Sequence, residues 1–179
     1  MELVRLTLAD RSTLEKVLGE FKKQVCAQKI KPELVEYLTL KEVEEIGPDS
    51  GLVVAREKQL LAGLLLYQLL HPKNFDELRI MLTQAPNDVL RGPNGTIDEA
   101  AQLSKAEGFN GIRFTGAIAY VHLIESFKRC AGVARTLIGE ARQIPSVEGI
   151  ILQPSLLETV QVYERLGFCN SGISTQGME

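Results

Sequence analysis

The sequence has few of the residues that build metal centres or disulfide frameworks. It contains three cysteines and two histidines. The cysteines (Cys26, Cys130 and Cys169) are widely spaced, no Cys-x-x-Cys pair occurs, and neither histidine lies near a second ligand type at zinc-site spacing. We therefore expect no bound metal, and reduced thiols of the kind found in cytoplasmic proteins. Cys130 is more simply explained as a small packed thiol than as a nucleophile.

The sequence also lacks a strong charge imbalance and a long apolar run. The formal net charge is -3, with basic and acidic residues interspersed, so a nucleic-acid-binding surface is not expected. The longest apolar run, residues 60–70, is interrupted by glycine and polar residues and is too short to cross a bilayer. The N-terminus has no basic region followed by a long apolar core, as a signal peptide would have. These features predict a cytoplasmic protein that does not bind membranes.

The composition is that of a globular protein. Hydrophobic residues make up 45% and charged residues 24% of the 179 residues. A chain of this length can bury a sizeable core within one unit. We therefore expect a single domain that spans residues 1–179.

The N-terminal part of the sequence predicts a strand followed by two helices. Residues 3–8 alternate in polarity, as in a half-buried strand. Ser12 and Glu15 have the spacing of a capping box, and apolar residues at helical spacing follow them. A second helix is expected within residues 33–47, closed by Gly47.

The middle of the sequence predicts a hairpin and then an insertion. Two apolar runs, residues 51–57 and 60–70, flank a polar break, which is typical of a β-hairpin. The second run is apolar on both faces, as expected of a central strand. Residues 71–111 are rich in proline and turn signals, with a short helix predicted after Thr96, and are expected to form an insertion between the third and fourth strands. An active-site lid and a packing appendage are both open, and we favour the appendage.

The C-terminal part alternates strands and helices. A long strand is expected over residues 116–126 and a helix over 132–143. A strand over 147–155 leads into a helix that begins with a capping box at Ser155. Residues 168–174 can supply a last strand.

The segment between the strand 116–126 and the helix 132–143 has the composition of a phosphate-binding helix start. The first amides of a helix lack intrahelical partners, and the helix dipole adds partial positive charge there. Small residues leave these amides open to a pyrophosphate, and one arginine adds a full charge. The plainer alternative is that Gly132 only relieves crowding in a turn. The expected phosphate cradle consists of Arg129, Cys130, Ala131, Gly132, Val133 and Ala134.

Two motifs in order resemble the GNAT superfamily of N-acyltransferases. The sequence has neither the GxxxxGK[ST] loop nor a GxGxxG near its first strand. The cradle instead matches the pattern Gln/Arg-x-x-Gly-x-Gly/Ala, and residues 163–168 match Tyr-x-x-Leu-Gly-Phe. The order of expected strands and helices is also similar, except in residues 71–111. The resemblance implies an α/β (α+β) fold, with a mixed, mostly antiparallel central sheet and helices on both faces.

The resemblance also implies roles for individual residues. The backbone of Leu123 and Ile124 would pair with the pantetheine arm of acetyl-CoA, and the cradle would bind its pyrophosphate. Tyr163 would protonate the leaving thiolate, although it could instead be a half-buried helix residue. Two positions depart from the family pattern: Leu156 stands where an asparagine is common, and Cys130 where glycine or alanine is common.

No glutamate or histidine stands at the positions where the family has its general base. The family positions for a glutamate or histidine base are Tyr120 and Ile118. Strand alternation would put Tyr120, His122 and Ile124 on one side, and His122 could serve because its ordinary pKa is near neutral. A histidine that is hydrogen-bonded beneath the sheet is the alternative. Glu125 would point to the opposite face unless a bulge re-aims it. A base acting through water, or no base, is also open.

The resemblance therefore implies an N-acetyltransferase that moves an acetyl group from acetyl-CoA to a primary amine by direct attack, with Tyr163 as the acid and His122 or a water as the base. The alternative is a non-catalytic domain that binds acyl-CoA. The acceptor would be a small-molecule amine or a protein amine. An exposed edge strand near the C-terminus could pair two chains into a homodimer.

Overall fold

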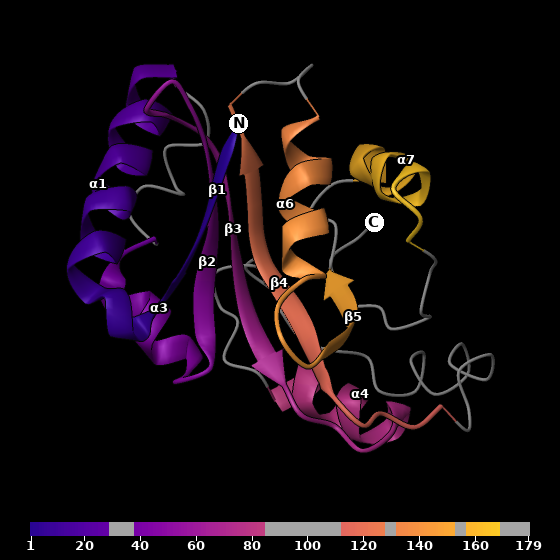
Figure 1. Cartoon of the computed structure of the whole chain (residues 1–179). Helices are drawn as coiled ribbons and strands as arrows, with labels where there is room; N and C mark the ends of the chain where they lie inside the picture. Colours follow the sequence, from indigo (N-terminus) through magenta and orange to yellow (C-terminus); the bar gives the residue numbers. More distant parts are fainter. Residues whose placement is uncertain (29–37, 85–111, 128–131, 153–156, 169–179) are drawn as a thin grey trace.

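The chain folds into one β-sheet with helices on both faces (Figure 1). This computed structural model describes residues 1–28, 38–84, 112–127, 132–152 and 157–168. The described strands lie in the order β1-β2-β3-β4-β5. Neighbours from β1 to β4 are antiparallel, and β5 is parallel to β4. The elements are β1 (Glu2–Thr7), a 3-10 turn (Leu8–Asp10), α1 (Arg11–Gln28), α3 (Leu40–Ile46), β2 (Ser50–Glu57), β3 (Leu60–Leu70), α4 (Phe75–Gln84), β4 (Ala117–Ser126), α6 (Val133–Ala141), β5 (Val147–Leu152) and α7 (Leu157–Arg165).

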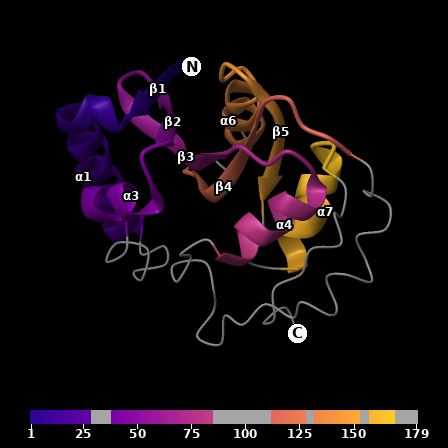
Figure 2. The same cartoon turned by 90° about the horizontal axis from the view of Figure 1, so that it is seen from below.

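The predicted fold class is confirmed by this arrangement. Helices α1 and α3 cover one face of the sheet, and α6 and α7 cover the other (Figure 2). Along β2, Leu52 and Val54 pack in the cluster with α1, whereas Val53 and Ala55 pack in the cluster with α6. Because successive strand residues point to opposite faces, apolar runs in β2 and β3 can fill both clusters at once.

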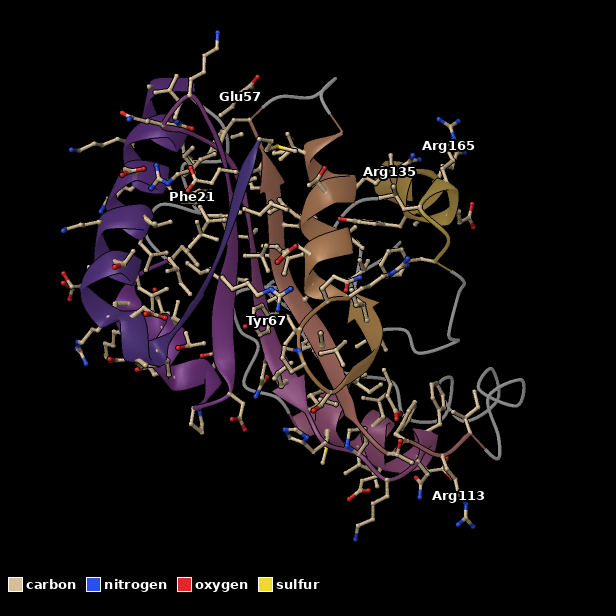
Figure 3. The ribbon with its side chains drawn as sticks, in the orientation of Figure 1. Phe21, Glu57, Tyr67, Arg113, Arg135 and Arg165 are labelled. Carbon is tan, nitrogen blue, oxygen red and sulfur yellow. The ribbon has the colours of Figure 1, made fainter. Side chains whose placement is uncertain are left out.

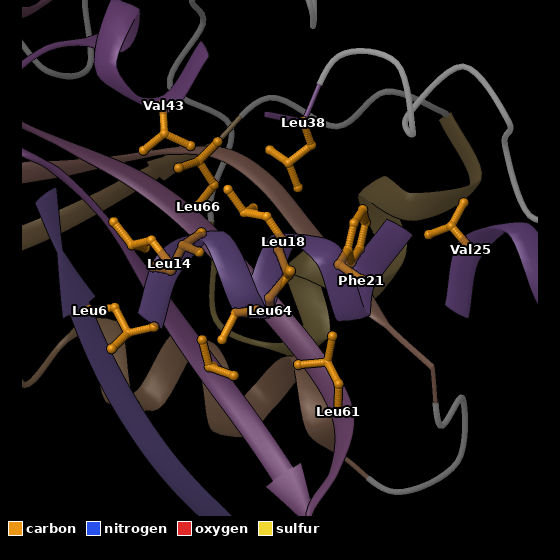
Figure 4. Close-up of a cluster of buried hydrophobic side chains, with 13 residues drawn as sticks. Leu6, Leu14, Leu18, Phe21, Val25, Leu38, Val43, Leu61, Leu64 and Leu66 are labelled. Carbon is orange, nitrogen blue, oxygen red and sulfur yellow. The ribbon is translucent and has the colours of Figure 1, made fainter. Parts of the chain in front are cut away.

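The two clusters form the core. Phe21 on α1 is buried in one cluster and Tyr67 on β3 in the other, on opposite sides of the sheet (Figure 3). Figure 4 shows the cluster beneath α1, where Leu14 and Leu64 are completely buried. Burying one such side chain contributes roughly 1.5–3 kcal/mol.

The start of α1 differs from the prediction. The structure shows a capping box at Thr7 and Asp10, rather than at Ser12 and Glu15. Asp10 Oδ2 accepts hydrogen bonds from the Thr7 amide at 2.9 Å and from the Thr7 hydroxyl at 3.2 Å. The 3-10 turn that follows leads directly into α1, so Ser12 already lies inside the helix. The capping-box spacing occurs twice in this part of the sequence, at Thr7 and Asp10 and at Ser12 and Glu15. Strand β1 ends at the first of these two positions.

The second helix is shorter than expected in its described part. Helix α3 begins after Thr39, whose hydroxyl accepts a hydrogen bond from the Glu42 amide at 3.4 Å. Glu42 Oε2 accepts a hydrogen bond from the Thr39 amide at 2.8 Å. This box starts a new helix close to the predicted end at Gly47, where φ is +138°. Residues 33–37, the start of the predicted helix, lie outside the described residues.

The predicted β2–β3 hairpin is confirmed. Its tight turn places Lys58 and Gln59 at positive φ, 49° and 67°. Two such residues match the right-handed twist of the flanking strands.

The segment predicted to be an insertion starts with a packed helix. Phe75 and Leu78 of α4 are buried against Leu70, Ile118 and Tyr120. The Phe114 amide donates a hydrogen bond to the Lys73 carbonyl at 3.0 Å, which joins the two ends of the segment. Residues 85–111, the predicted helix after Thr96 and the last strand beyond residue 168 lie outside the described residues. The single-domain organisation with an insertion stays a prediction.

Candidate active site

A β-bulge interrupts β4 at His122. Leu66 on β3 pairs with Leu123, but Tyr67 pairs with Val121, so His122 is an extra residue between two regular stretches. A bulge of this kind changes which residues share a face of the strand. Ile124 consequently packs in the cluster with α6, and Leu123 packs in the cluster with α1.

The bulge makes the alternation predicted for β4 wrong. Tyr120 pairs with Gln68 and lies in the cluster with α4, on the face that α1 and α3 cover, whereas Ile124 lies on the α6 face. His122 contacts Gln68 and Tyr120, so these three side chains lie on one side of the sheet. Ile124 lies on the other side. Glu125 pairs with Leu64, a residue of the α1 cluster. The bulge therefore puts the Glu125 position on the same face as His122.

The described pairing of β4 with β5 ends beside the bulge. It is parallel and runs from Ala117 and Val147 to Val121 and Leu152, and residues 153–156 lie outside the described residues. β4 continues through Ser126, beside helix α6 (Figure 1). The part of β4 that contains Leu123 and Ile124 thus follows the last described pair with β5.

His122 is buried, with 5% of its surface exposed. Its Nε2 lies 3.1 Å from Gln68 Oε1, and its ring meets the Tyr120 ring edge-on with 4.6 Å between centroids. Burial lowers the pKa of the imidazole to about 4. His122 is therefore neutral at pH 7 and is a weak base.

Tyr163 lies on α7, on the other side of the sheet from His122. Its ring packs edge-on against Phe168, and it joins the cluster that contains Ile124 and Val133. Burial raises the pKa of the Tyr163 hydroxyl, and the charge of Glu125 raises it further. The hydroxyl therefore keeps its proton at neutral pH.

The start of α6 is open around Gly132. Gly132 caps the helix with φ +67°, and a Cβ built there would meet no atom within 4 Å. The described residues therefore do not crowd this position, and the positive φ alone already favours glycine. Val133 is buried, and Ala134 is half-buried. Arg129, Cys130 and Ala131 lie outside the described residues, as do the Ser155 capping box and Leu156.

Gly63 brings α6 close to β3. A Cβ at Gly63 would lie 2.8 Å from Val133 Cγ1 and 2.6 Å from the Glu125 carbonyl oxygen. Real Cβ atoms do not come so close to other atoms, so glycine is required for this packing. The helix start and the extended part of β4 meet here.

The structure thus brings part of the predicted site together. Ile124, Val133 and Tyr163 share one cluster, whereas Leu123 and His122 lie toward the opposite face. Sequence reasoning missed Gln68, and no motif marks this residue. Among the described residues, no three His, Cys, Asp or Glu side chains are grouped to hold a metal ion. None of the described helices is long and apolar enough to cross a membrane.

The sequence matches no protein-family model and no curated protein. Its structure is similar to an aminoglycoside acetyltransferase from an uncultured soil metagenomic sample, with a TM-score of 0.53, 14% identity and coverage of 94% of this chain and 91% of that chain. It is also similar to AAC(6')-Iy bound to the bisubstrate analogue CoA-S-monomethyl-acetylneamine, with a TM-score of 0.52, 13% identity and coverage of 95% and 91%. At this identity the likeness concerns the backbone, and it shows that the chain has the GNAT fold of these N-acetyltransferases.

Proposed function

We propose that the chain is an acyl-CoA-dependent N-acyltransferase that transfers an acetyl group from acetyl-CoA to a primary amine. The observation that carries this proposal is the bulge in β4, directly after its last described pair with β5 and beside the glycine-capped start of α6. The similar AAC(6')-Iy structures contain CoA or a CoA-derived bisubstrate analogue. Acetyl-CoA would supply an already activated thioester, so no covalent enzyme intermediate is needed.

The residues at the start of α6 fit a pyrophosphate. The space where a Gly132 side chain would stand is open, and the first helical amides follow directly. These amides, together with the predicted charge of Arg129, would bind the phosphates. We therefore keep the six-residue cradle from Arg129 to Ala134 as the proposed coenzyme-binding loop.

The backbone of Leu123 and Ile124 would hold the reacting end of the acyl donor. These residues follow the bulge and the last described pair with β5. Backbone N–H groups at such a strand edge can pair with an extended ligand and polarise a carbonyl.

Tyr163 is the proposed general acid. Its raised pKa keeps the hydroxyl protonated at neutral pH, so Tyr163 can donate a hydrogen bond, and then its proton, to the leaving thiolate. It shares a cluster with Ile124, which ties it to the extended part of β4.

The proposed base changes from His122 to Glu125. A histidine with a pKa of about 4 is too weak a base to take a proton readily from an ammonium group. The bulge puts the Glu125 position on the same face of the sheet as His122. The charge of Glu125 raises the pKa of the Tyr163 hydroxyl. A carboxylate on the extended part of β4 can accept the proton of the amine, directly or through water. The proposed acceptor is a primary amine of a small molecule or a protein.

Calorimetric titration of acetyl-CoA tests this function first. We expect binding in the parent and in Gly139→Glu, because a Cβ at Gly139 on the same helix also meets no atom within 4 Å. Gly132→Glu adds the same charge at the helix start and should abolish binding through repulsion of the phosphates. Equal binding by both variants, or none in the parent, would refute the coenzyme site.

Kinetics then separate an enzyme from a non-catalytic binding domain. Tyr163→Phe should lower kcat by about 100-fold or more and leave the acetyl-CoA Kd unchanged, because only the transferred proton is lost. Coenzyme binding without acetylation of any amine by the parent would favour the binding domain. An unchanged kcat in Tyr163→Phe would remove Tyr163 as the acid.

A further inference from the structure

The side-chain amide of Gln68 connects three elements of the fold. Gln68 lies on β3, and its Nε2 donates a hydrogen bond to the Ile46 carbonyl at the end of α3, at 3.0 Å. Its Oε1 lies 3.1 Å from Nε2 of His122, the bulged residue of β4. One amide thus joins the end of α3, the centre of the sheet and the bulge.

The donor and acceptor capacities of these groups decide which ring nitrogen of His122 carries the proton. A backbone carbonyl only accepts, so the NH₂ end of Gln68 must face Ile46, and its oxygen must face His122. The His122 Nε2 must then be the donor. Since a neutral imidazole carries one N–H, the Gln68 amide fixes His122 as the Nε2–H tautomer.

The same contacts hold the bulge in place. His122 is buried, so loss of the Gln68 acceptor would leave its N–H without that hydrogen bond inside the fold. A Cβ at Gly47 would lie 3.4 Å from Gln68 Nε2, so the end of α3 also packs closely on this amide. If the bulge were lost, uninterrupted strand alternation would exchange the faces of Leu123, Ile124 and Glu125 relative to Tyr120.

We propose that Gln68 is a positioning residue of the acyl-transfer site, which sets the tautomer of His122 and holds the β4 bulge next to the last described β4–β5 pair. This inference rests on the proposed function. Through the bulge, Gln68 decides which way the backbone of Leu123 and Ile124 and the side chain of Glu125 face. In this proposal, His122 helps Gln68 to hold the bulge and does not act as the general base.

Nitrogen-15 NMR of the histidine rings tests the connection without any assay of activity. The chain has only two histidines, so His71 serves as the internal reference. We expect the parent to show His122 at pH 7 as a single, neutral Nε2–H tautomer. Gln68→Met, of similar length but with no amide, should abolish this single-tautomer signal. A parent spectrum with the Nδ1–H tautomer, or an unchanged His122 signal in Gln68→Met, would overturn the proposal.

Two further variants separate positioning from loss of structure. Gln68→Glu keeps an acceptor for His122 but loses the donor to Ile46, so it should keep the Nε2–H signal. Gln143→Met makes the same chemical change at an exposed residue and should behave like the parent. A Gln68→Glu spectrum like that of Gln68→Met would show that the acceptor oxygen does not set the tautomer.

Kinetics give the functional result. Gln68→Met should lower kcat by about tenfold or more, because a small misplacement of reacting groups is costly, whereas the acetyl-CoA Kd should not change. Gln68→Glu should recover part of kcat. Equal kcat in Gln68→Met and the parent would overturn the positioning role. Absence of acetyl-CoA binding in the parent would instead refute the proposed function, and the tautomer result would stand separately.

Discussion

Two bulges in the same sheet differ in position and in chemistry. In the β2–β3 pair, Ala55 faces Gly63 and Arg56 faces Leu61, so Ala62 is the extra residue, close to the hairpin turn. In the β3–β4 pair, the extra residue is His122, in the middle of the strand. Ala62 is an apolar side chain in the α6 cluster, whereas His122 carries a polar ring bonded to Gln68.

The difference shows that a bulge alone does not make a site. The first bulge lies where β3 is paired on both sides, with β2 and with β4. The second directly follows the last described pair of β4 with β5. Only the second lies beside the proposed acyl-transfer site, and it is the one held by buried polar groups. Three measurements would break or sharpen this comparison.

The largest expected effect is a loss of stability in acid that depends on His122. The unfolded ring has a pKa near 6.5, whereas burial lowers the folded pKa to about 4. Between these values the unfolded chain binds a proton that the folded chain does not, so stability falls as pH decreases from 6.5 to 4. The full difference corresponds to about 3 kcal/mol.

Urea unfolding at pH 7, 5.5 and 4.5, values spaced across the roughly two-unit window that the shift defines, measures this effect. His122→Gln should remove most of the slope, whereas His71→Gln, at an exposed position, controls for loss of a histidine. A slope that survives in His122→Gln would show that other groups destabilise the protein in acid.

The next effect concerns Gly63, beside the first bulge. Gly63→Ala would place a methyl group 2.8 Å from Val133 Cγ1, and we expect a loss of about 1–3 kcal/mol. Gly139→Ala on α6 is the matched control and should stabilise by about 0.5–1 kcal/mol, because its Cβ meets nothing within 4 Å. Thermal unfolding of both variants checks this. If both changes stabilised the protein, the close approach of α6 to β3 would be wrong.

The smallest effect is expected at the polar group of the first bulge. Arg56 Nη1 lies 2.8 Å from Glu20 Oε2 and donates to the Gln59 carbonyl at 3.1 Å, near solvent. Glu20→Gln should therefore cost at most about 1 kcal/mol in urea unfolding, and less at high salt. If Glu20→Gln destabilised the protein as much as loss of the Gln68 contact to His122, the difference between the two bulges would be contradicted.

Much of the fold could be predicted from local patterns. The hairpin, the long strand β4, and the helix that starts after Gly132 follow from apolar periodicity and from residues suited to a turn or cap. Ambiguous local signals produced the errors. The capping spacing at Ser12 repeats one already used at Thr7, and Thr39 starts a helix within a continuous helical pattern.

The site was predictable only in part. Gly132 and Tyr163 stand in motifs, and both lie beside the extended part of β4 or in its cluster. The faces of Ile124 and Glu125 were predicted from uninterrupted alternation, and the bulge reverses them.

The sequence by itself determined most of the described strands and helices, because periodicity and caps act over a few neighbouring residues, but it did not predict α4. Only the tertiary structure decided where β4 bulges and which side chain holds His122. These features depend on strand register and on a contact between residues 54 positions apart. Register is set by the packing of both faces together, and no local pattern contains it.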